Sequence, residues 1–327
     1  MDLNNLLSEF VERVESRINK TIPAKQPETI YEPFRYIMDG GGKRIRPALT
    51  MLSAGACGSD PFSAIDCAAA IEILHNFTLV HDDIMDGSEK RRGRQTVHIK
   101  WTPAAAIITG DAMIGYAMKL LPNSKDNSRG DEIKSVFIKG LIEVCEGQGF
   151  DMEFNQKHDV SNDDYNVMIA KKTSAILQTA VLMGAHCAEA SDEELEALSN
   201  FAYHLGIGFQ IQDDYLDMTA DEKLLGKKVG LDIVEGKKTF LIINAMIEAK
   251  SNEDVDLLAE YYQNNGLPLE RVPEFDKMFN RLGIYDLALN ESQKRFEKAK
   301  QSLNALSSNN YSILLSELTD KIFRRKM

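Results

Sequence analysis

The sequence predicts an all-α protein, on three observations. Apolar residues recur every three or four positions along nearly the whole chain, beginning with residues 3–18, and this is the spacing of one helix face. No stretch alternates apolar and polar residues as a half-buried strand does, and no Asn-Gly turn joins two such stretches. No linker rich in Pro, Gly or Ser divides the chain, so we expect one helical domain over residues 1–327.

Individual helices are marked by their capping residues. Asp60-Pro61 and Thr102-Pro103 each combine an N-cap side chain with a proline in the first turn, and Ser191 with Glu194 forms a capping box. Together with the periodicity they predict long helices over residues 61–84, 103–121, 131–155, 163–188 and 191–218, and shorter ones over 233–249, 253–264, 268–281, 284–305 and 309–323. The segments expected to be loops are 122–130, 156–163 and 219–238.

The overall charge and composition exclude several classes of protein. The 327 residues carry 38 Lys and Arg against 50 Asp and Glu, a net charge of −12, which disfavours a dedicated nucleic-acid-binding protein. No apolar run approaches the ~20 residues that span a bilayer, and the N-terminus is acidic and amphipathic, unlike a signal peptide. The four Cys include no Cys-x-x-Cys pair and are expected to be buried thiols. We therefore expect a cytoplasmic protein without a membrane span.

Two aspartate clusters are the most informative residues. Residues 82–86 and 213–217 each read Asp-Asp-x-x-Asp near the end of a long apolar helix, which places the first and last carboxylates on one helix face. Such crowded carboxylates require a cation, and hard oxygen ligands favour Mg²⁺, which typically bridges carboxylates to substrate phosphates. An EF-hand is excluded by Ile84 at a ligand position, and a zinc site by the lack of clustered His and Cys. The alternative, two solvated helix ends, fits one such cluster better than two matching copies.

Basic residues gather near the same segments. The motif GGGKRIRP over residues 40–47 places Lys43 and Arg46 three residues apart at the start of an expected helix, so that both side chains point the same way. Arg91-Arg92 follows the first aspartate cluster, and further Lys pairs stand at 171–172, 227–228 and 237–238. Each pair alone is typical of a solvated surface. Together with the aspartates they predict a cavity for two diphosphates, one held through Mg²⁺ and one held directly by Lys and Arg.

The motifs GGGKRIRP, LVHDDIMDGSEKRRG, AKKTSA, GFQIQDDYLD and GKKVGLDIVEGKKT resemble, in that order, the motif set of the trans (E-type) isoprenyl diphosphate synthases, the polyprenyl synthetase family. The resemblance implies the isoprenoid synthase fold, a large single helical bundle around a central cavity, in a homodimer. It also implies head-to-tail prenyl transfer, in which isopentenyl diphosphate is joined to a C5, C10 or C15 allylic diphosphate and pyrophosphate is released.

The resemblance further implies a role for each motif residue. Three Mg²⁺ ions are expected, two at Asp82 and Asp86 and one at Asp213. The implied metal ligands, direct or through water, are Asp82, Asp86, Asp213 and Asp217, and the residues that support them are Asp83, Asp214, Gln148 and Asp151. Isopentenyl diphosphate would be bound by Lys43, Arg46, His75 and Arg92. The allylic diphosphate would be bound by Arg91, Lys172, Thr173, Gln210, Lys237 and either Lys227 or Lys228, of which Lys227 is preferred.

Product length is expected to depend on the helix that carries Asp82. Phe77 lies five residues earlier, about 7.5 Å along a helix, and its neighbour Thr78 is small. A bulky ring at this depth is typical of a floor beneath a short chain, so we expect the C20 product geranylgeranyl diphosphate, with the C15 product farnesyl diphosphate as the alternative. The basic C-terminus, Arg324–Lys326, is expected to fold over the isopentenyl diphosphate site.

Three other functions remain open on the sequence alone. A terpene cyclase or head-to-head synthase would need no second diphosphate pocket. A non-catalytic synthase subunit would be expected to have lost an aspartate cluster, and both clusters are present. A helical protein that binds Mg²⁺ for stability alone would release no pyrophosphate.

Overall fold

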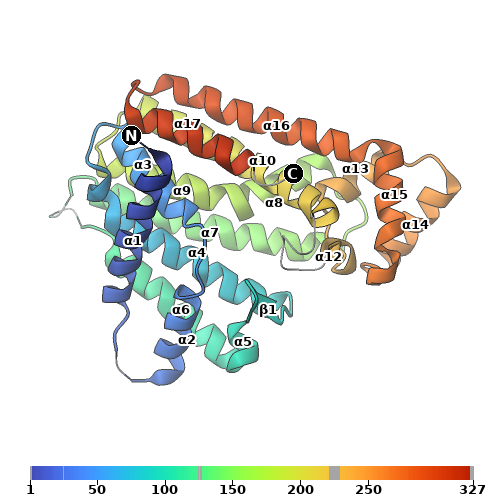
Figure 1. The fold of residues 1–327 in the computed structure, drawn as a ribbon. Coiled ribbons are helices and arrows are strands. Elements are labelled where there is room, and N and C mark those ends of the chain that lie inside the picture. Colours follow the sequence, from blue (N-terminus) through green and yellow to red (C-terminus); the bar gives the residue numbers. More distant parts are fainter. Residues whose placement is uncertain (1, 25, 124, 126, 221–228, 325–327) are drawn as a thin grey trace. The chain divides into compact units, whose positions relative to one another are not determined.

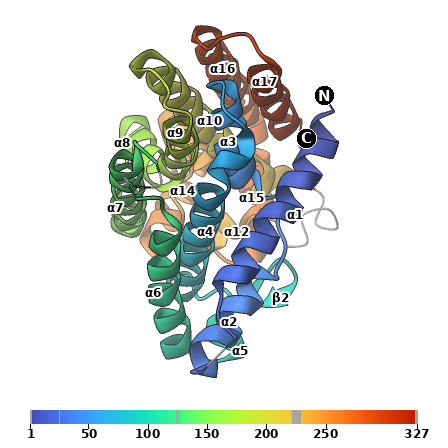
Figure 2. The ribbon, with the colours of Figure 1, turned by 90° about the vertical axis from the view of Figure 1, so that its left-hand side faces the viewer.

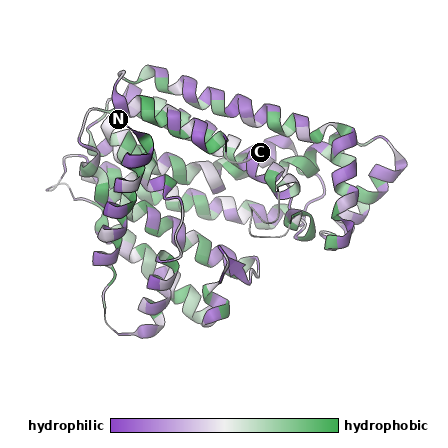
Figure 3. Ribbon diagram, viewed as in Figure 1, coloured by the Kyte–Doolittle hydropathy of each residue, from purple (hydrophilic) through white to green (hydrophobic). Residues whose placement is uncertain are grey.

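The computed structural model describes residues 2–324 except 25, 124, 126 and 221–228. Helices account for 78% of the chain, and within the described residues the only strands are β1 (Lys90–Arg91) and β2 (Arg94–Gln95). The all-α prediction is therefore confirmed (Figure 1). Hydrophilic and hydrophobic residues alternate along the helices in Figure 3, as the three-to-four spacing predicts for amphipathic helices.

The chain forms two compact units. Unit 1 comprises Met1–Leu141, Ile176–Ser199 and Leu303–Glu317, and unit 2 comprises Ile142–Ala175, Asn200–Ser302 and Leu318–Met327. Four of the five boundaries between units fall inside helices, namely α7 (Gly130–Phe154), α9 (Ala175–Cys187), α10 (Asp192–Thr219) and α17 (Asn310–Phe323). The fifth lies between Ser302 and Leu303, where α16 (Ile284–Ser302) meets η4 (Leu303–Ala305). The single domain expected over residues 1–327 stays a prediction.

Unit 1 is built around helix α4. Its other elements are α1 (Leu3–Thr21), α2 (Glu28–Met38), α3 (Ile45–Ala56), η1 (Pro61–Ala64), α5 (Val97–Lys100), α6 (Pro103–Leu120), nearly all of α9 (Ala175–Cys187) and η4 (Leu303–Ala305). Helix α4 (Ile65–Met85) packs against α1, α2, α3 and α6 (Figure 2). By length and composition Pro61–Met85 would suffice to cross a membrane, so the expectation that no apolar run is long enough was wrong. Because 67% of its most apolar window is buried inside the protein, this helix is a core element.

Unit 2 has its own hydrophobic core. Its elements are α8 (Asn162–Ile169), η2 (Ala170–Ser174), α12 (Leu231–Val234), α13 (Phe240–Glu248), α14 (Asn252–Asn264), η3 (Leu269–Arg271), α15 (Val272–Leu282) and α16 (Ile284–Ser302). Helix α13 packs against α8, α15 and α16, and its residues Phe240–Ala245 are all buried. The expected helix over 233–249 is broken, because residues 235–239 form a loop between α12 and α13.

The predicted helix starts are confirmed by their hydrogen bonds. The Asp60 side chain accepts from the backbone N–H of Phe62 at 3.0 Å, and Thr102 Oγ1 accepts from Ala105 at 3.1 Å. In the capping box, the backbone N–H of Ser191 donates to the Glu194 carboxylate at 2.9 Å and Ser191 Oγ accepts from the backbone of Glu194 at 3.3 Å. These contacts satisfy N–H groups that a helix start otherwise leaves without partners.

Candidate active site

The first aspartate cluster ends helix α4 in unit 1. Asp82 is half-buried in the last turn, and Asp86 is the exposed C-cap residue. Asp83 is buried, and its Oδ1 accepts a hydrogen bond from Arg91 Nε at 2.8 Å. Burial raises the pKa of Asp83 above its ordinary value, although the charge of Arg91 acts in the opposite direction. The cluster therefore divides into two accessible carboxylates suited to a hard cation and one buried carboxylate that holds an arginine.

Arg91 and Arg92 belong to the β1–β2 hairpin, which the sequence analysis did not predict. Arg92 and Gly93 form its two-residue turn, with φ values of 52° and 74°. Two positive φ values are typical of a type I′ turn, whose usual Asn-Gly signal is replaced here by Arg-Gly. The Arg92 side chain donates to the carbonyl oxygen of Gly41, whereas Arg91 donates to Asp83. The two adjacent arginines therefore have different partners.

The glycine-rich motif has a geometry different from the expected one. Helix α3 begins at Ile45, and Pro47 is accommodated in its first turn, where no backbone donor is needed. Because Lys43 precedes the helix, Lys43 and Arg46 do not share a helix face, and that prediction was wrong. Arg44 has a left-handed backbone conformation (φ 47°, ψ 39°) and a buried side chain, whereas Lys43 is exposed.

Arg46 and His75 are buried basic residues of unit 1 that interact electrostatically. Arg46 Nε is buried and has no hydrogen-bond partner in the protein. Burial lowers the pKa of Arg46 to about 10, and Glu72 acts in the opposite direction. Burial, followed by the charges of Arg46 and Arg92, lowers the pKa of His75 well below its ordinary value. A buried donor without an acceptor among mutually repelling cations fits a bound anion.

The second aspartate cluster lies near the C-terminal end of α10 in unit 2. Asp213 is exposed, whereas Asp214 is buried. The hydrogen-bond donors to Asp214 are Gln210 Nε2 at 2.9 Å, the backbone N–H of Phe240 at 2.9 Å and Tyr165 Oη at 2.8 Å. Burial raises the pKa of Asp214 to about 7, and these hydrogen bonds oppose that rise. Asp214 therefore orients its neighbours, while Asp213 faces solvent.

Asp217 is buried at the end of the same cluster. Its Oδ2 accepts from the backbone N–H of Asp232 at 3.1 Å, and its carbonyl oxygen accepts from Gly230 at 2.7 Å. A carboxylate oxygen has a second lone pair, so this hydrogen bond is compatible with a bound cation. Within the described residues, no three His, Cys, Asp or Glu side chains form a metal-binding group. A sparse set of carboxylates fits Mg²⁺, which keeps several waters and binds substrate phosphates.

Thr173 and Gln210 are paired. Thr173 Oγ1 donates to Gln210 Oε1 at 3.0 Å, and the amide nitrogen of Gln210 donates to Asp214. Asp214 therefore fixes which end of the amide faces Thr173. Thr173 lies in η2, Ala170–Ser174, a single turn of π-helix between α8 and α9. Such turns occur frequently at functional sites.

Asp151 joins the two lysines expected at the allylic diphosphate. Its Oδ2 accepts from Lys172 Nζ at 2.6 Å and from Lys237 Nζ at 3.5 Å. Burial raises the pKa of Asp151, but the two lysines outweigh this effect and the net pKa is lowered. Gly147, one turn earlier on α7, permits the close approach, since a Cβ there would lie 2.3 Å from the backbone nitrogen of Lys172. Gln148 is buried beside it.

The loop that carries Lys237 is held by helix α14. Tyr261 Oη donates to the carbonyl oxygen of Lys237 at 2.6 Å. Lys238 is buried, and its ammonium lies 4.6 Å from the ring centroid of Tyr262, a cation–π geometry. Burial lowers the pKa of Lys238 to about 8. The aromatic pair on α14 thus fixes the backbone from which Lys237 extends.

Phe77 and Thr78 lie on α4 as expected. Phe77 is buried, and its ring makes a T-shaped contact with His81 at 4.7 Å between centroids. Thr78 Oγ1 donates to the carbonyl oxygen of His75 at 2.8 Å. Phe77 is therefore a fixed, bulky side chain, as a floor for a growing product requires.

Some of these residues were beyond the reach of the sequence analysis. The roles of Tyr165 and Glu72 carry no local signal, because each acts through a partner distant in sequence. The π turn is hidden within the helical periodicity of 163–188. Lys227, Lys228 and residues 325–327 lie outside the described residues.

Comparisons with known proteins agree with this arrangement. The sequence profile described as Polyprenyl synthetase matches residues 27–277. A geranylgeranyl diphosphate synthase of Methanosarcina mazei is 37% identical over 100% of both chains, and a short chain isoprenyl diphosphate synthase of Methanothermobacter thermautotrophicus is 36% identical over 100% of this chain and 99% of that one.

A solved structure extends the similarity to the fold. The crystal structure of geranylgeranyl pyrophosphate synthetase from Pyrococcus horikoshii has a TM-score of 0.90 at 34% identity, covering 99% of this chain and 98% of that chain. The two carboxylate clusters, the buried Arg46 beside His75 and the full-length similarity lead to one conclusion. This chain belongs to the polyprenyl synthetase family and is a prenyltransferase with the all-α isoprenoid synthase fold.

Proposed function

We propose that this prenyltransferase condenses isopentenyl diphosphate with a C5, C10 or C15 allylic diphosphate to give geranylgeranyl diphosphate and pyrophosphate. The observation that carries the proposal is the buried Arg46 Nε without a partner, beside His75 and Arg92. Arg46, His75 and Arg92 bind one diphosphate by direct contact, whereas the aspartates bind the other through Mg²⁺. A terpene cyclase needs no such second anion site.

The metal proposal follows from the chemistry of the carboxylates. The family is Mg²⁺-dependent in general. We propose three ions, two held by Asp82 and Asp86 and one by Asp213 with Asp217. When bound, Mg²⁺ supplies positive charge to the diphosphate leaving group as its C–O bond breaks.

The protein groups divide the remaining work. Arg91, Lys172, Lys237 and Lys227 bind the allylic diphosphate, and Asp151 orients Lys172 and Lys237 through its ion pairs with them. The paired oxygens of Thr173 and Gln210 stabilise positive charge on the allylic carbon by their dipoles. The C=C bond of isopentenyl diphosphate then attacks this carbon, and an oxygen of the departing pyrophosphate accepts the proton that is lost.

Product length is proposed to be C20, with Phe77 as the floor of the chain pocket. Relatives of full-length similarity that are named geranylgeranyl diphosphate synthase support this length. F77L and F77A remove progressively more side-chain volume. We expect the main product of F77A to be longer by at least one C5 unit, and F77L to form a smaller fraction of such longer products. Chromatographic sizing of the dephosphorylated products measures this. An unchanged distribution in both variants would place the floor elsewhere.

We propose that the protein is a cytoplasmic homodimer, and the exposed apolar residues of helix α6 support the homodimer. Ile107, Ile108 and Met118 lie on one of its faces and are 46%, 51% and 44% exposed. An apolar helix face of this kind fits a second copy of the chain. Light scattering of the wild type should give the mass of a dimer, and I108E should shift it towards the monomer. A monomeric wild type would contradict the proposal.

The experiment that tests the function is an incubation with Mg²⁺, labelled isopentenyl diphosphate and each allylic diphosphate in turn. We expect one dominant C20 product from every primer and stoichiometric pyrophosphate release. C15 alone, or products beyond C20, would contradict the proposed length but not the chemistry. A hydrocarbon formed without isopentenyl diphosphate would indicate a cyclase. No Mg²⁺-dependent product would indicate a non-catalytic subunit.

A further inference from the structure

Arg44 lies between Lys43 and Arg46 in the glycine-rich motif, and its side chain makes several polar contacts. Its side chain is 2% exposed although it lies in a loop. Its guanidinium donates to Glu72 Oε1 at 2.7 Å, to the carbonyl oxygen of Met38 at 2.7 Å and to Glu15 Oε1 at 3.1 Å. These acceptors lie on α4, at the end of α2 and on α1. One side chain therefore ties the loop to three helices.

Glu72 is the buried partner in this arrangement. It is 3% exposed, and its Oε1 also accepts from Asn76 Nδ2 at 3.1 Å, one turn further along α4. A buried carboxylate without a counter-charge is costly, so Glu72 and Arg44 depend on each other. Glu72 also acts electrostatically on Arg46 and Arg92. Glu72 therefore pairs with Arg44 and interacts electrostatically with both Arg46 and Arg92.

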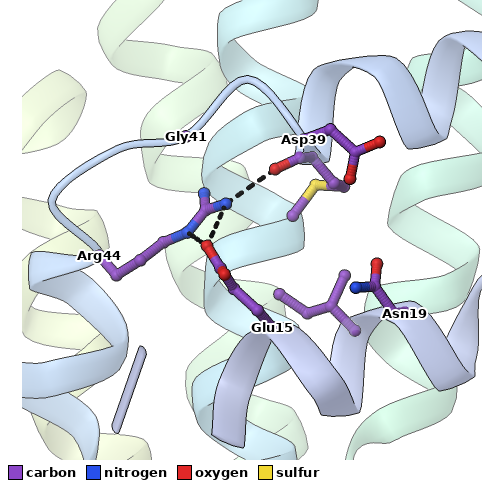
Figure 4. Close-up of a pocket in the computed structure, with 7 residues that line it drawn as sticks. Glu15, Asn19, Asp39, Gly41 and Arg44 are labelled. Atoms are coloured by element: carbon purple, nitrogen blue, oxygen red, sulfur yellow. Dashed lines mark hydrogen bonds and ion pairs between the residues drawn. The ribbon is translucent and has the colours of Figure 1, made fainter. Parts of the chain in front are cut away.

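The loop rests on polar contacts more than on packing. A cavity of about 300 Å³ lies beneath it, lined by Glu15, Met38, Asp39, Gly41 and Arg44 among others. Figure 4 shows the Arg44 side chain crossing from the loop to Glu15 and the end of α2. Since side chains do not fill the space beside Gly41, polar contacts, those of the Arg44 guanidinium among them, hold the loop in place.

The left-handed backbone of Arg44 explains how one motif serves two purposes. At φ 47° the chain reverses direction, and this conformation is uncommon for a residue other than Gly, Asn or Asp. The reversal leaves Lys43 exposed while Arg44 enters the core. From the other face, Arg92 donates to Gly41. The loop is held from both sides.

We propose that Arg44 and Glu72 are positioning residues, which set the place of Lys43 and Arg46 in the isopentenyl diphosphate pocket. The inference rests on the proposed function. It predicts selectivity, because the proposed ligands of the allylic diphosphate, such as Lys172 and Lys237, lie on other elements. Loss of the Arg44–Glu72 ion pair should weaken the binding of isopentenyl diphosphate and leave the binding of the allylic diphosphate unchanged.

The test uses the full-length variants R44M, E72M and R44M/E72M, with R44K as the conservative change. In R44M we expect the KM for isopentenyl diphosphate to rise roughly tenfold or more, since small displacements of binding groups have effects of this size. The KM for the allylic diphosphate should stay within about twofold. R44K should recover part of the loss. The double variant should regain thermal stability relative to R44M, because an apolar pair replaces a broken buried ion pair, and should keep the raised KM.

The matched control is R17M. Arg17 donates to Asp66, so it also ties α1 to α4 by an ion pair, but away from the glycine-rich loop. R17M should change stability without changing either KM. An unchanged KM for isopentenyl diphosphate in R44M, or its full recovery in the double variant, would overturn the proposal.

Failure of the proposed function and failure of this inference give different results. If the wild type forms no product, the proposed function fails. Calorimetric titration of isopentenyl diphosphate into wild type and R44M then still tests the positioning role of Arg44. If R44M does not fold, R44K and E72Q give the same test of KM with smaller changes. If the variants bind isopentenyl diphosphate as tightly as the wild type, the positioning role of Arg44 and Glu72 is overturned, whether or not R44M folds.

Discussion

The two aspartate clusters have the same spacing but different partners at their middle residue. Asp83 is buried against Arg91 in an ion pair. Asp214 is buried against an amide, a phenol and a backbone N–H, all of them neutral. Burial raises the pKa of both carboxyl groups, and for Asp214 it reaches about 7. In contrast, the first residues of the two clusters, Asp82 and Asp213, remain accessible.

This difference shows what a motif does and does not determine. The i and i+4 spacing fixes which carboxylates can face a common ligand, because helix geometry is local. The charge and task of the residue between them depend on elements far away in sequence. In unit 1 that element is a hairpin, and in unit 2 it is the start of α13 together with α8. Asp83 therefore positions a cation, and Asp214 positions an amide.

The largest effect is expected from removing the first carboxylate of either cluster. D82N and D213N each lose a proposed Mg²⁺ ligand, and several kcal/mol of transition-state stabilisation corresponds to roughly a thousandfold or greater loss of kcat. Steady-state kinetics at saturating Mg²⁺ measures this. S88A, near the first cluster but without a carboxylate, is the control. Activity within tenfold of wild type in D82N would contradict the proposal that Asp82 holds Mg²⁺ as Asp213 does.

A smaller, substrate-specific effect is expected in D83N. Asparagine keeps one acceptor for Arg91 but removes the counter-charge, so Arg91 is held less firmly. We expect the KM for the allylic diphosphate to rise roughly tenfold, with the KM for isopentenyl diphosphate nearly unchanged. If both constants rose equally, Asp83 would act on the whole of unit 1 instead of on Arg91.

D214N should act differently from D83N. An asparagine amide facing Gln210 Nε2 would oppose donor to donor, so Gln210 is expected to turn over and present its NH₂ group to Thr173. Loss of one oriented carbonyl dipole, about 1 kcal/mol, lowers kcat roughly fivefold with little change in either KM. Q210E, in which both ends are oxygen, is the companion variant. A rise in KM without a fall in kcat would contradict this role.

The burial of His75 among arginines predicts that the stability of the protein depends on pH. Folded His75 stays neutral because burial and its arginine neighbours lower its pKa, whereas unfolded His75 takes up a proton below its ordinary pKa of about 6.5. Stability contributed at this position is therefore lost as the pH falls, by about 1 kcal/mol between pH 7.5 and 5.5. Urea unfolding of H75Q should lack this loss, whereas H158Q, at an exposed histidine, should retain it. If the free energy of unfolding had the same pH dependence in wild type and H75Q, this contribution of His75 would be ruled out.

Local signals predicted most of the fold. Helix starts at Asp60, Thr102 and Ser191 were recognisable because a cap is a contact within one turn. The hairpin was missed because its strands are two residues long and its turn is Arg-Gly. The start of α3 was placed too early because a left-handed Arg44 is stabilised by partners on three helices, which no local pattern indicates.

The candidate site divides in the same way. The carboxylates and cations proposed to bear the chemistry were chosen from their motifs, and their roles stay predictions. The contacts that assign partners to them were not, since Asp83 with Arg91, Asp151 with its lysines and Asp214 with Tyr165 all depend on tertiary structure.

The most direct measurement is the Mg²⁺ concentration that gives half-maximal pyrophosphate release in D82N, D83N, D213N and D214N, with wild type alongside. If the outer aspartates hold metal and the middle ones position neighbours, D82N and D213N need at least tenfold more Mg²⁺, and D83N and D214N need no more than wild type. An equal requirement in all four variants, or a larger one in D83N or D214N than in D82N, would contradict the division of roles within the two clusters.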